Sequence, residues 1–87
     1  MTDAFRYRAD VLEHLLRHGV RPTPRTPPDL VRNFVRDLYK YEIRMLRERY
    51  VRGEFAKRDY AERVEALRRR YPVLALHAWQ FVEQSRE

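Results

Sequence analysis

The segment from Leu30 to Tyr50 constrains the fold more than any other part of the sequence. It contains neither glycine nor proline, and its apolar residues recur at helical spacing. At 100° per residue they cover an arc of about 200°, wider than a helix needs to contact a single neighbour. The arc consists of Leu30, Tyr41, Phe34, Met45, Leu38, Val31, Val35, Leu46, Tyr39, Tyr50 and Ile43. The sequence therefore predicts a long amphipathic helix that contacts partners on two sides.

The remaining face of this predicted helix is polar and mainly positive. Its members are Arg36, Lys40, Arg44, Arg47, Asn33 and Asp37. The whole chain has 19 Lys and Arg residues against 13 Asp and Glu residues, for a net charge of +6. Arginine forks bind phosphate and carboxylate groups, so an acidic partner such as nucleic acid is one interpretation. The other is that arginine simply replaces lysine on a solvated face.

Both ends of the long helix carry boundary signals. Residues 20–28 hold four of the five prolines. Because proline lacks an amide donor and disfavours helical geometry in the residue before it, this segment is expected to be a stiff, extended connector. We expect the helix to begin between Thr26 and Asp29 and to end near Arg52.

A further amphipathic helix is predicted ahead of the connector, from about Asp3 to His18. Thr2 is a suitable N-cap residue, and Gly19 is a suitable residue to end the helix. Its apolar side is formed by Phe5, Val11, Leu12, Leu15 and Leu16.

Gly53 interrupts the pattern after the long helix, and a third helix is predicted from about Lys57 to Arg70. Its narrow apolar stripe indicates that it folds back on the long helix as a hairpin. The stripe consists of Tyr60, Val64, Leu67 and Tyr71. Three consecutive arginines, 68–70, end this helix, where cations favourably meet the negative end of the macrodipole.

Pro72 is expected to end the third helix and to begin a new element. The segment from Val73 to Val82 is apolar on nearly every side. We predict a fourth helix here, which either fills the core or forms an oligomer surface. The predicted fold class is all-α, a small four-helix domain of residues 1–87 with a long central helix in a helical hairpin.

In the stretch Leu46–Leu67, a helix is followed by Gly53, Phe55, the pair Asp59-Tyr60, and Leu67. With these residues the stretch resembles the short C-terminal helical-hairpin domain known as SHOCT. In that family a helix is followed by a glycine, by a hydrophobic residue two positions later, and by an acidic-aromatic pair that opens the next helix. Ala56 stands where the family usually has threonine or serine. The resemblance implies a helical hairpin in this part of the chain.

No combination of residues indicates catalysis or a bound cofactor. The chain has no cysteine and only two glycines, so a thiol nucleophile and a phosphate-binding glycine loop are both excluded. His14 and His18 have the spacing of metal ligands, with Asp10 one turn earlier, but no third ligand accompanies them except the distant His77. Surface histidines are the preferred interpretation, and we predict neither enzyme activity nor a cofactor.

Two further features need partners. Glu42 falls inside the apolar arc, where a carboxylate is costly unless it is paired. An ion pair with an arginine or hydrogen bonds from tyrosine hydroxyls are expected there. Tyr39 and Tyr50 border the arc near the basic face and are the candidate residues for stacking on nucleic-acid bases.

The sequence thus predicts a non-enzymatic helical protein-interaction module that binds a protein partner or itself as a homo-oligomer. Its candidate apolar interaction surface is formed by Tyr39, Ile43, Tyr50, Leu74, Trp79 and Phe81. The alternative is a small nucleic-acid-binding protein with little sequence specificity. Its candidate basic patch is Arg36, Lys40, Arg44, Arg47, Arg68, Arg69 and Arg70. We expect a cytoplasmic protein that does not span a membrane.

Overall fold

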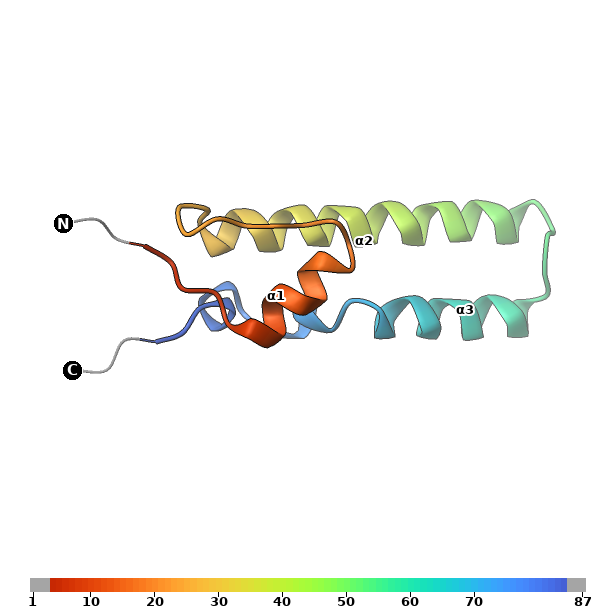
Figure 1. Ribbon diagram of the computed structural model, residues 1–87. Coiled ribbons are helices and arrows are strands. Elements are labelled where there is room, and N and C mark those ends of the chain that lie inside the picture. Colours follow the sequence, from red (N-terminus) through yellow and green to blue (C-terminus); the bar gives the residue numbers. More distant parts are fainter. Residues whose placement is uncertain (1–3, 85–87) are drawn as a thin grey trace.

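A computed structural model describes residues 4–84 of the chain (Figure 1). These residues form three α-helices and two short 3₁₀ turns, which confirms the all-α prediction. The elements are α1 (Ala9–Leu16), α2 (Pro28–Val51), α3 (Lys57–Arg69), η1 (Pro72–Ala75) and η2 (Ala78–Phe81). Within this part of the chain, no helix has the length and apolar character that crossing a membrane requires.

The long helix α2 begins and ends where the sequence predicts. Pro28 occupies the first turn, where the missing amide hydrogen of proline costs no hydrogen bond. The helix ends at Val51, and Gly53 follows with a φ of 82°. A residue with a side chain would be strained in this left-handed conformation, so glycine is needed at this turn.

The helices α2 and α3 lie side by side and run in opposite directions (Figure 1). At their far end the ring of Tyr50 stacks on Tyr60, with ring centroids 4.5 Å apart. Arg49 and Arg52 both bind the carboxylate of Glu54 in the connecting segment, at 2.8 and 3.0 Å. These hydrogen bonds lower the pKa of Glu54. The connection between the two helices is therefore held by both aromatic and ionic contacts.

The first helix is shorter than predicted. It begins at Ala9 and ends at Leu16, and the residues before it are extended. The amide of Phe5 donates to the carbonyl of Pro24 at 2.7 Å, and Tyr7 forms an isolated antiparallel bridge with Val82. These long-range bonds replace the helical bonds that the sequence pattern predicts for residues 4–8. The predicted cap Thr2 lies outside the described residues.

The predicted fourth helix over 73–82 is wrong. The segment forms the two 3₁₀ turns η1 and η2, separated by extended backbone at His77. The guanidinium of Arg32 on α2 donates to the carbonyls of Leu74 and Leu76, at 2.8 and 2.7 Å. A continuous helix would need these same carbonyl oxygens for its own backbone bonds. Charge-assisted hydrogen bonds from α2 therefore hold the segment in two turns.

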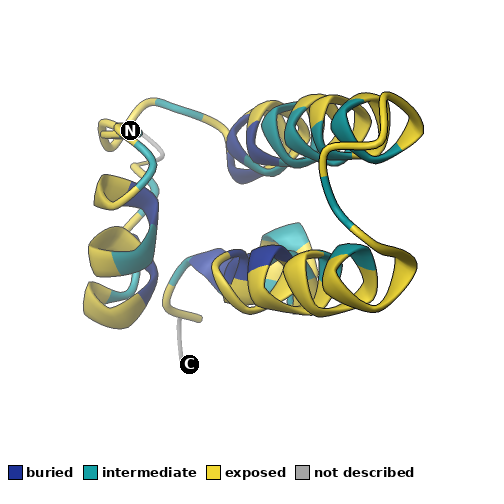
Figure 2. Ribbon diagram, turned by 90° about the vertical axis from the view of Figure 1, so that its right-hand side faces the viewer, coloured by how far each residue is buried: buried dark blue, intermediate teal, exposed yellow. Residues whose placement is uncertain are grey.

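The core lies where α1, the beginning of α2, the end of α3 and the C-terminal turns face one another. Figure 2 shows the buried ribbon segments concentrated at this end of the helix pair. The radius of gyration is 16.1 Å, against about 12 Å for a compact domain of this length. The buried core residues are Tyr7, Val11, Leu15, Val31, Val35, Leu67, Tyr71, Val73 and Phe81.

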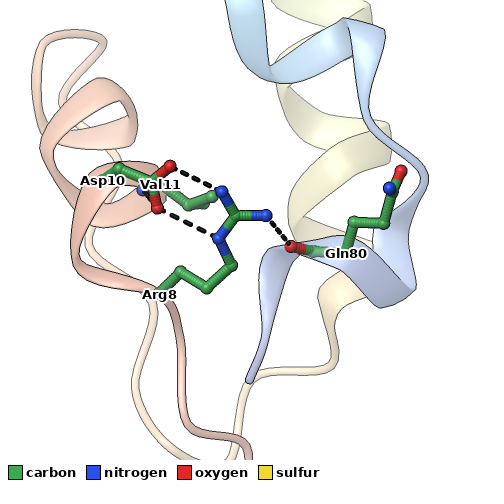
Figure 3. Close-up of polar contacts among 4 residues, drawn as sticks. All are labelled: Arg8, Asp10, Val11 and Gln80. Carbon is green, nitrogen blue, oxygen red and sulfur yellow. Dashed lines mark hydrogen bonds and ion pairs between the residues drawn. The ribbon is translucent and has the colours of Figure 1, made fainter. Parts of the chain in front are cut away.

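Arg8 attaches the start of α1 to the C-terminal turn η2 (Figure 3). Its guanidinium donates to both carboxylate oxygens of Asp10, at 3.1 and 2.6 Å, and to the carbonyl of Gln80, at 3.0 Å. The hydrogen bond from Arg8 lowers the pKa of Asp10. A single side chain thereby links segments that are far apart in the sequence.

Tyr7 makes the fold lose stability at alkaline pH. Its hydroxyl donates to the carbonyl of Thr26 at 2.5 Å, and burial raises its pKa from 10.0 to about 12. The folded state therefore favours the uncharged phenol. The associated stability, about 3 kcal/mol, is fully present below pH 10 and is lost as the pH rises through about 12.

We therefore expect Tyr7→Phe to flatten the fall of unfolding free energy between pH 10 and pH 12, measured by urea titrations at several pH values. The variant should also lose about 1 kcal/mol at neutral pH, because the hydrogen bond to Thr26 is absent. An unchanged pH slope in the variant would contradict this role of Tyr7. Tyr71, whose pKa is also raised by burial, remains in both proteins as a common background.

Candidate helix-docking surface

One edge of α2 exposes a row of large apolar side chains. Leu30, Phe34, Tyr41 and Met45 are 62, 57, 56 and 37% exposed. We call these four residues the α2 stripe. At 100° per residue they fall within about 60° of one another around the helix, so they form a narrow seam along its length.

The α2 stripe is one edge of the wide apolar arc. The middle of the arc is buried in the core through Val31 and Val35. The opposite edge is covered by α3 and the residue after it, because Tyr50 stacks on Tyr60 and Tyr39 meets the ring of Tyr71 edge-on. Contacts are predicted on two sides of α2. Within residues 4–84 one of these sides is covered, and the side that carries the stripe stays exposed.

The residues of the predicted apolar interaction surface differ in exposure. Phe81 is fully buried in the core, and Tyr39, Ile43 and Leu74 are half-buried and packed against it. Of the six predicted residues only Trp79 is largely exposed. The most exposed side chains of the apolar arc on α2 are those of the stripe, which the sequence pattern places in the arc but not in the candidate interaction surface.

The tyrosines proposed for base stacking already have ring partners. Tyr39 contacts Tyr71 with ring centroids 5.2 Å apart, and Tyr50 stacks on both Phe55 and Tyr60. The ring of Tyr50 is therefore already stacked within the molecule, and the ring of Tyr39 is in edge-on contact with Tyr71.

A groove runs between α2 and α3 next to the stripe. Its volume is about 440 Å³, and Tyr41 and Met45 of the stripe belong to its wall. Leu46 and Leu67 add apolar surface, while Arg63 lies over the ring of Phe55 at 4.5 Å. The groove therefore extends the apolar surface of the stripe from α2 onto α3.

The predicted basic residues fall into separate groups. Lys40, Arg44 and Arg47 are exposed on α2 and form no ion pair within residues 4–84. Arg36 is half-buried beside Asp37, at 3.6 Å, and its Nε is buried without a hydrogen-bond partner.

The three consecutive arginines at the end of α3 have different neighbours. Arg68 pairs with Glu65 at 3.3 Å, and its pKa is raised by hydrogen bonding with Tyr39 and by the charge of Glu65. Arg69 and Arg70 instead line a hollow shared with α1.

This hollow has a volume of about 500 Å³, and we call it the α1–α3 hollow. It contains both histidines that have metal-ligand spacing, but no group of three metal-binding side chains is present among the described residues. The ring of His18 stacks on Tyr71 with centroids 4.1 Å apart. The hollow is lined by His14, Arg17, His18, Leu38, Glu42, Arg69, Arg70 and Pro72.

Glu42 has the partners that its place in the apolar arc predicts. Arg70 donates to one carboxylate oxygen at 3.1 Å, and the hydroxyl of Tyr71 donates to the other. Burial, followed by the hydrogen bond to Glu42, raises the pKa of Tyr71. The prediction of an arginine or tyrosine partner is confirmed, and both are present.

Comparisons with known proteins found no matching family model, no similar curated protein and no similar solved structure. Function is therefore inferred from the geometry of these surfaces.

Proposed function

We propose that this chain is a non-enzymatic interaction module whose α2–α3 hairpin presents the α2 stripe to a second copy of the same chain. The exposure of four large apolar side chains along one seam of one helix supports the proposal. Single exposed apolar residues are common on protein surfaces, whereas contiguous rows of them are typical of interaction sites.

The surface area of the chain favours association. The accessible surface is 6940 Å² for a mass of 10.7 kDa, while a compact monomer of that mass exposes about 5,500 Å². A standard protein interface covers about 800 Å² on each partner. The excess is therefore large enough to supply one side of such an interface.

The spacing of the stripe favours a second copy as the partner. Its residues follow one another at steps of four, seven and four, so the pattern reads the same in both directions. In an antiparallel two-fold dimer, Leu30 lies level with Met45 of the second copy, and Phe34 lies level with Tyr41. Such a self-complementary patch is what an interface with two-fold symmetry requires.

The charges beside the stripe are compatible with this register. Asp37 and Lys40 lie on the same flank of α2, and both are exposed. In the antiparallel dimer, Asp37 lies about 3 Å along the axis from the level of Lys40 in the second copy. Lys40 of the second copy, together with Arg36 at 3.6 Å from Asp37, offsets the repulsion between the two Asp37 side chains, which lie next to the two-fold axis.

Self-association is tested by sedimentation equilibrium on the wild type, Phe34→Glu and Val51→Glu. Val51 is on the same helix and is 72% exposed, but it lies away from the stripe, so it provides a control with the same charge change. We expect Phe34→Glu to raise the dimer dissociation constant by about 100-fold or more, because it places a charge in the apolar seam. We expect Val51→Glu to change it by less than about threefold. A wild type that is monomeric at high micromolar concentration, or equal effects of both variants, would refute the proposal.

The register is tested by cysteine cross-linking, because the native chain contains no cysteine. Under mild oxidation, Asp37→Cys should cross-link to itself, since it lies beside the two-fold axis. Leu30→Cys should cross-link with Met45→Cys and not with itself. A dimer in which Leu30→Cys links to itself would be parallel, so the register would be wrong while self-association would stand.

Nucleic-acid binding is the second candidate. It is favoured by the absence of carboxylate partners, among residues 4–84, for Lys40, Arg44 and Arg47. A triple substitution of these residues to Gln should lower affinity for mixed oligonucleotides and reduce the salt slope by about three units. Fluorescence anisotropy at two salt concentrations measures both effects, and no binding by the wild type at low salt would exclude this function.

A further inference from the structure

The α1–α3 hollow collects basic side chains from two helix ends. The end of α1 and the turn after it contribute His14, Arg17 and His18, and the end of α3 contributes Arg69 and Arg70. Among residues 4–84, Glu42 is the only carboxylate in its wall. We propose that this hollow is a binding site for a phosphate group, independent of the α2 stripe.

The arginines of the hollow retain unused hydrogen-bond donors. Arg70 binds Glu42 through one terminal nitrogen, and Arg17 lies 3.7 Å from Glu13. Arg69 has neither an ion pair nor a side-chain hydrogen bond within residues 4–84. Because each guanidinium carries five N–H donors, most donors at this site have no protein acceptor. The site can therefore donate to the several oxygens of a phosphate group.

A connected set of contacts holds the wall of the hollow in place. The Nε2 atom of His18 lies 2.6 Å from the carbonyl of Arg70, and the imidazole ring stacks on Tyr71. The hydroxyl of Tyr71 and the guanidinium of Arg70 both bind Glu42 on α2. Three segments of the chain are thus joined around the hollow before a ligand arrives, which reduces the ordering that binding requires.

Stabilisation of helix ends explains part of this charge. Cations near a helix C-terminus interact favourably with its macrodipole, and both α1 and α3 end at the hollow. Each helix end would gain this stabilisation even if the two ends did not face one another. Bringing the two basic groups together adds repulsion, which Glu42 beside Arg70 and Glu13 beside Arg17 offset only in part. A bound anion would offset the remainder.

The chemistry of the wall selects the class of ligand. Arginine forks match the geometry of phosphate oxygens, and three arginines oppose the binding of a metal cation. The volume of about 500 Å³ lies within the usual range for small-molecule pockets. The source of the phosphate is either a small phosphate ester or a nucleic-acid backbone, and the experiment includes both.

Isothermal titration calorimetry with inorganic pyrophosphate at low ionic strength tests the site. Arg69→Gln should weaken binding by about tenfold or more, because it removes a guanidinium with no protein partner. Arg58→Gln is the matched control, since it lies on the same helix and makes the same charge change about 16 Å away. We expect it to change the affinity by less than about twofold. No binding by the wild type, or equal weakening in both variants, would overturn the proposal.

A substitution that removes a negative charge, and should therefore strengthen binding, completes the test. Glu42→Gln retains an acceptor for Tyr71 but removes the only negative charge of the wall, so pyrophosphate should bind more tightly. Glu48→Gln, on the same helix but outside the hollow, should have no such effect. A single-stranded oligonucleotide that binds more tightly than pyrophosphate, with the same dependence on Arg69, would identify a nucleic-acid phosphate as the source. Glu42→Gln that leaves the affinity unchanged would contradict a site in this hollow.

Discussion

Phe81→Ala is expected to lower the free energy of unfolding by about 3–5 kcal/mol. The side chain of Phe81 is the largest of those that are fully buried, and it comes from a turn of only four residues. Its removal leaves a cavity between the C-terminal turn and the rest of the core. Because a small domain is stable by only about 5–10 kcal/mol, the variant should be close to unfolded at 37 °C.

Trp79→Ala provides the matched control. Trp79 belongs to the same turn and is also aromatic, but it is 60% exposed. Its truncation should cost less than about 1 kcal/mol, measured with Phe81→Ala in urea unfolding followed by circular dichroism. Similar losses in the two variants would show that the turn does not insert Phe81 selectively into the core.

The boundaries of α2 and α3 follow from local sequence, and the C-terminal turns do not. Pro28 and Gly53 set the ends of α2 through their own backbone preferences. The break at His77 depends on Arg32, which lies more than 40 residues earlier and binds the carbonyls of the turn. A single-sequence pattern contains no information about that contact, so it predicts a continuous helix.

The candidate surface was predictable only in part. The width of the apolar arc on α2 indicates correctly that one neighbour cannot cover it. Which edge of the arc stays exposed depends on the side of α2 on which α3 packs. Tertiary contacts, and not the local sequence of α2, determine that side. The different neighbours of Arg68 and Arg70 were predictable from the sequence, because side chains two residues apart on a helix point in very different directions.

Two adjacent residues of α2 separate folding from association. Val35 is fully buried, whereas Phe34 is largely exposed on the stripe. Val35→Glu places an ionised carboxylate in the core without a partner, and the cost of several kcal/mol is comparable to the whole stability of a small domain. We expect this variant to lose its cooperative unfolding transition and most of its helical circular dichroism signal at pH 7.

Phe34→Glu introduces the same carboxylate one position earlier, where water solvates it in the monomer. At protein concentrations where the wild type is monomeric, we expect its unfolding free energy to stay within about 1 kcal/mol of the wild-type value. At higher concentrations the wild type should gain stability through self-association, and Phe34→Glu should not. If both proteins unfold with the same midpoint at every concentration, the stripe does not mediate association. The α2 helix therefore has one face that the fold requires and another face that, in the proposed dimer, a second copy covers.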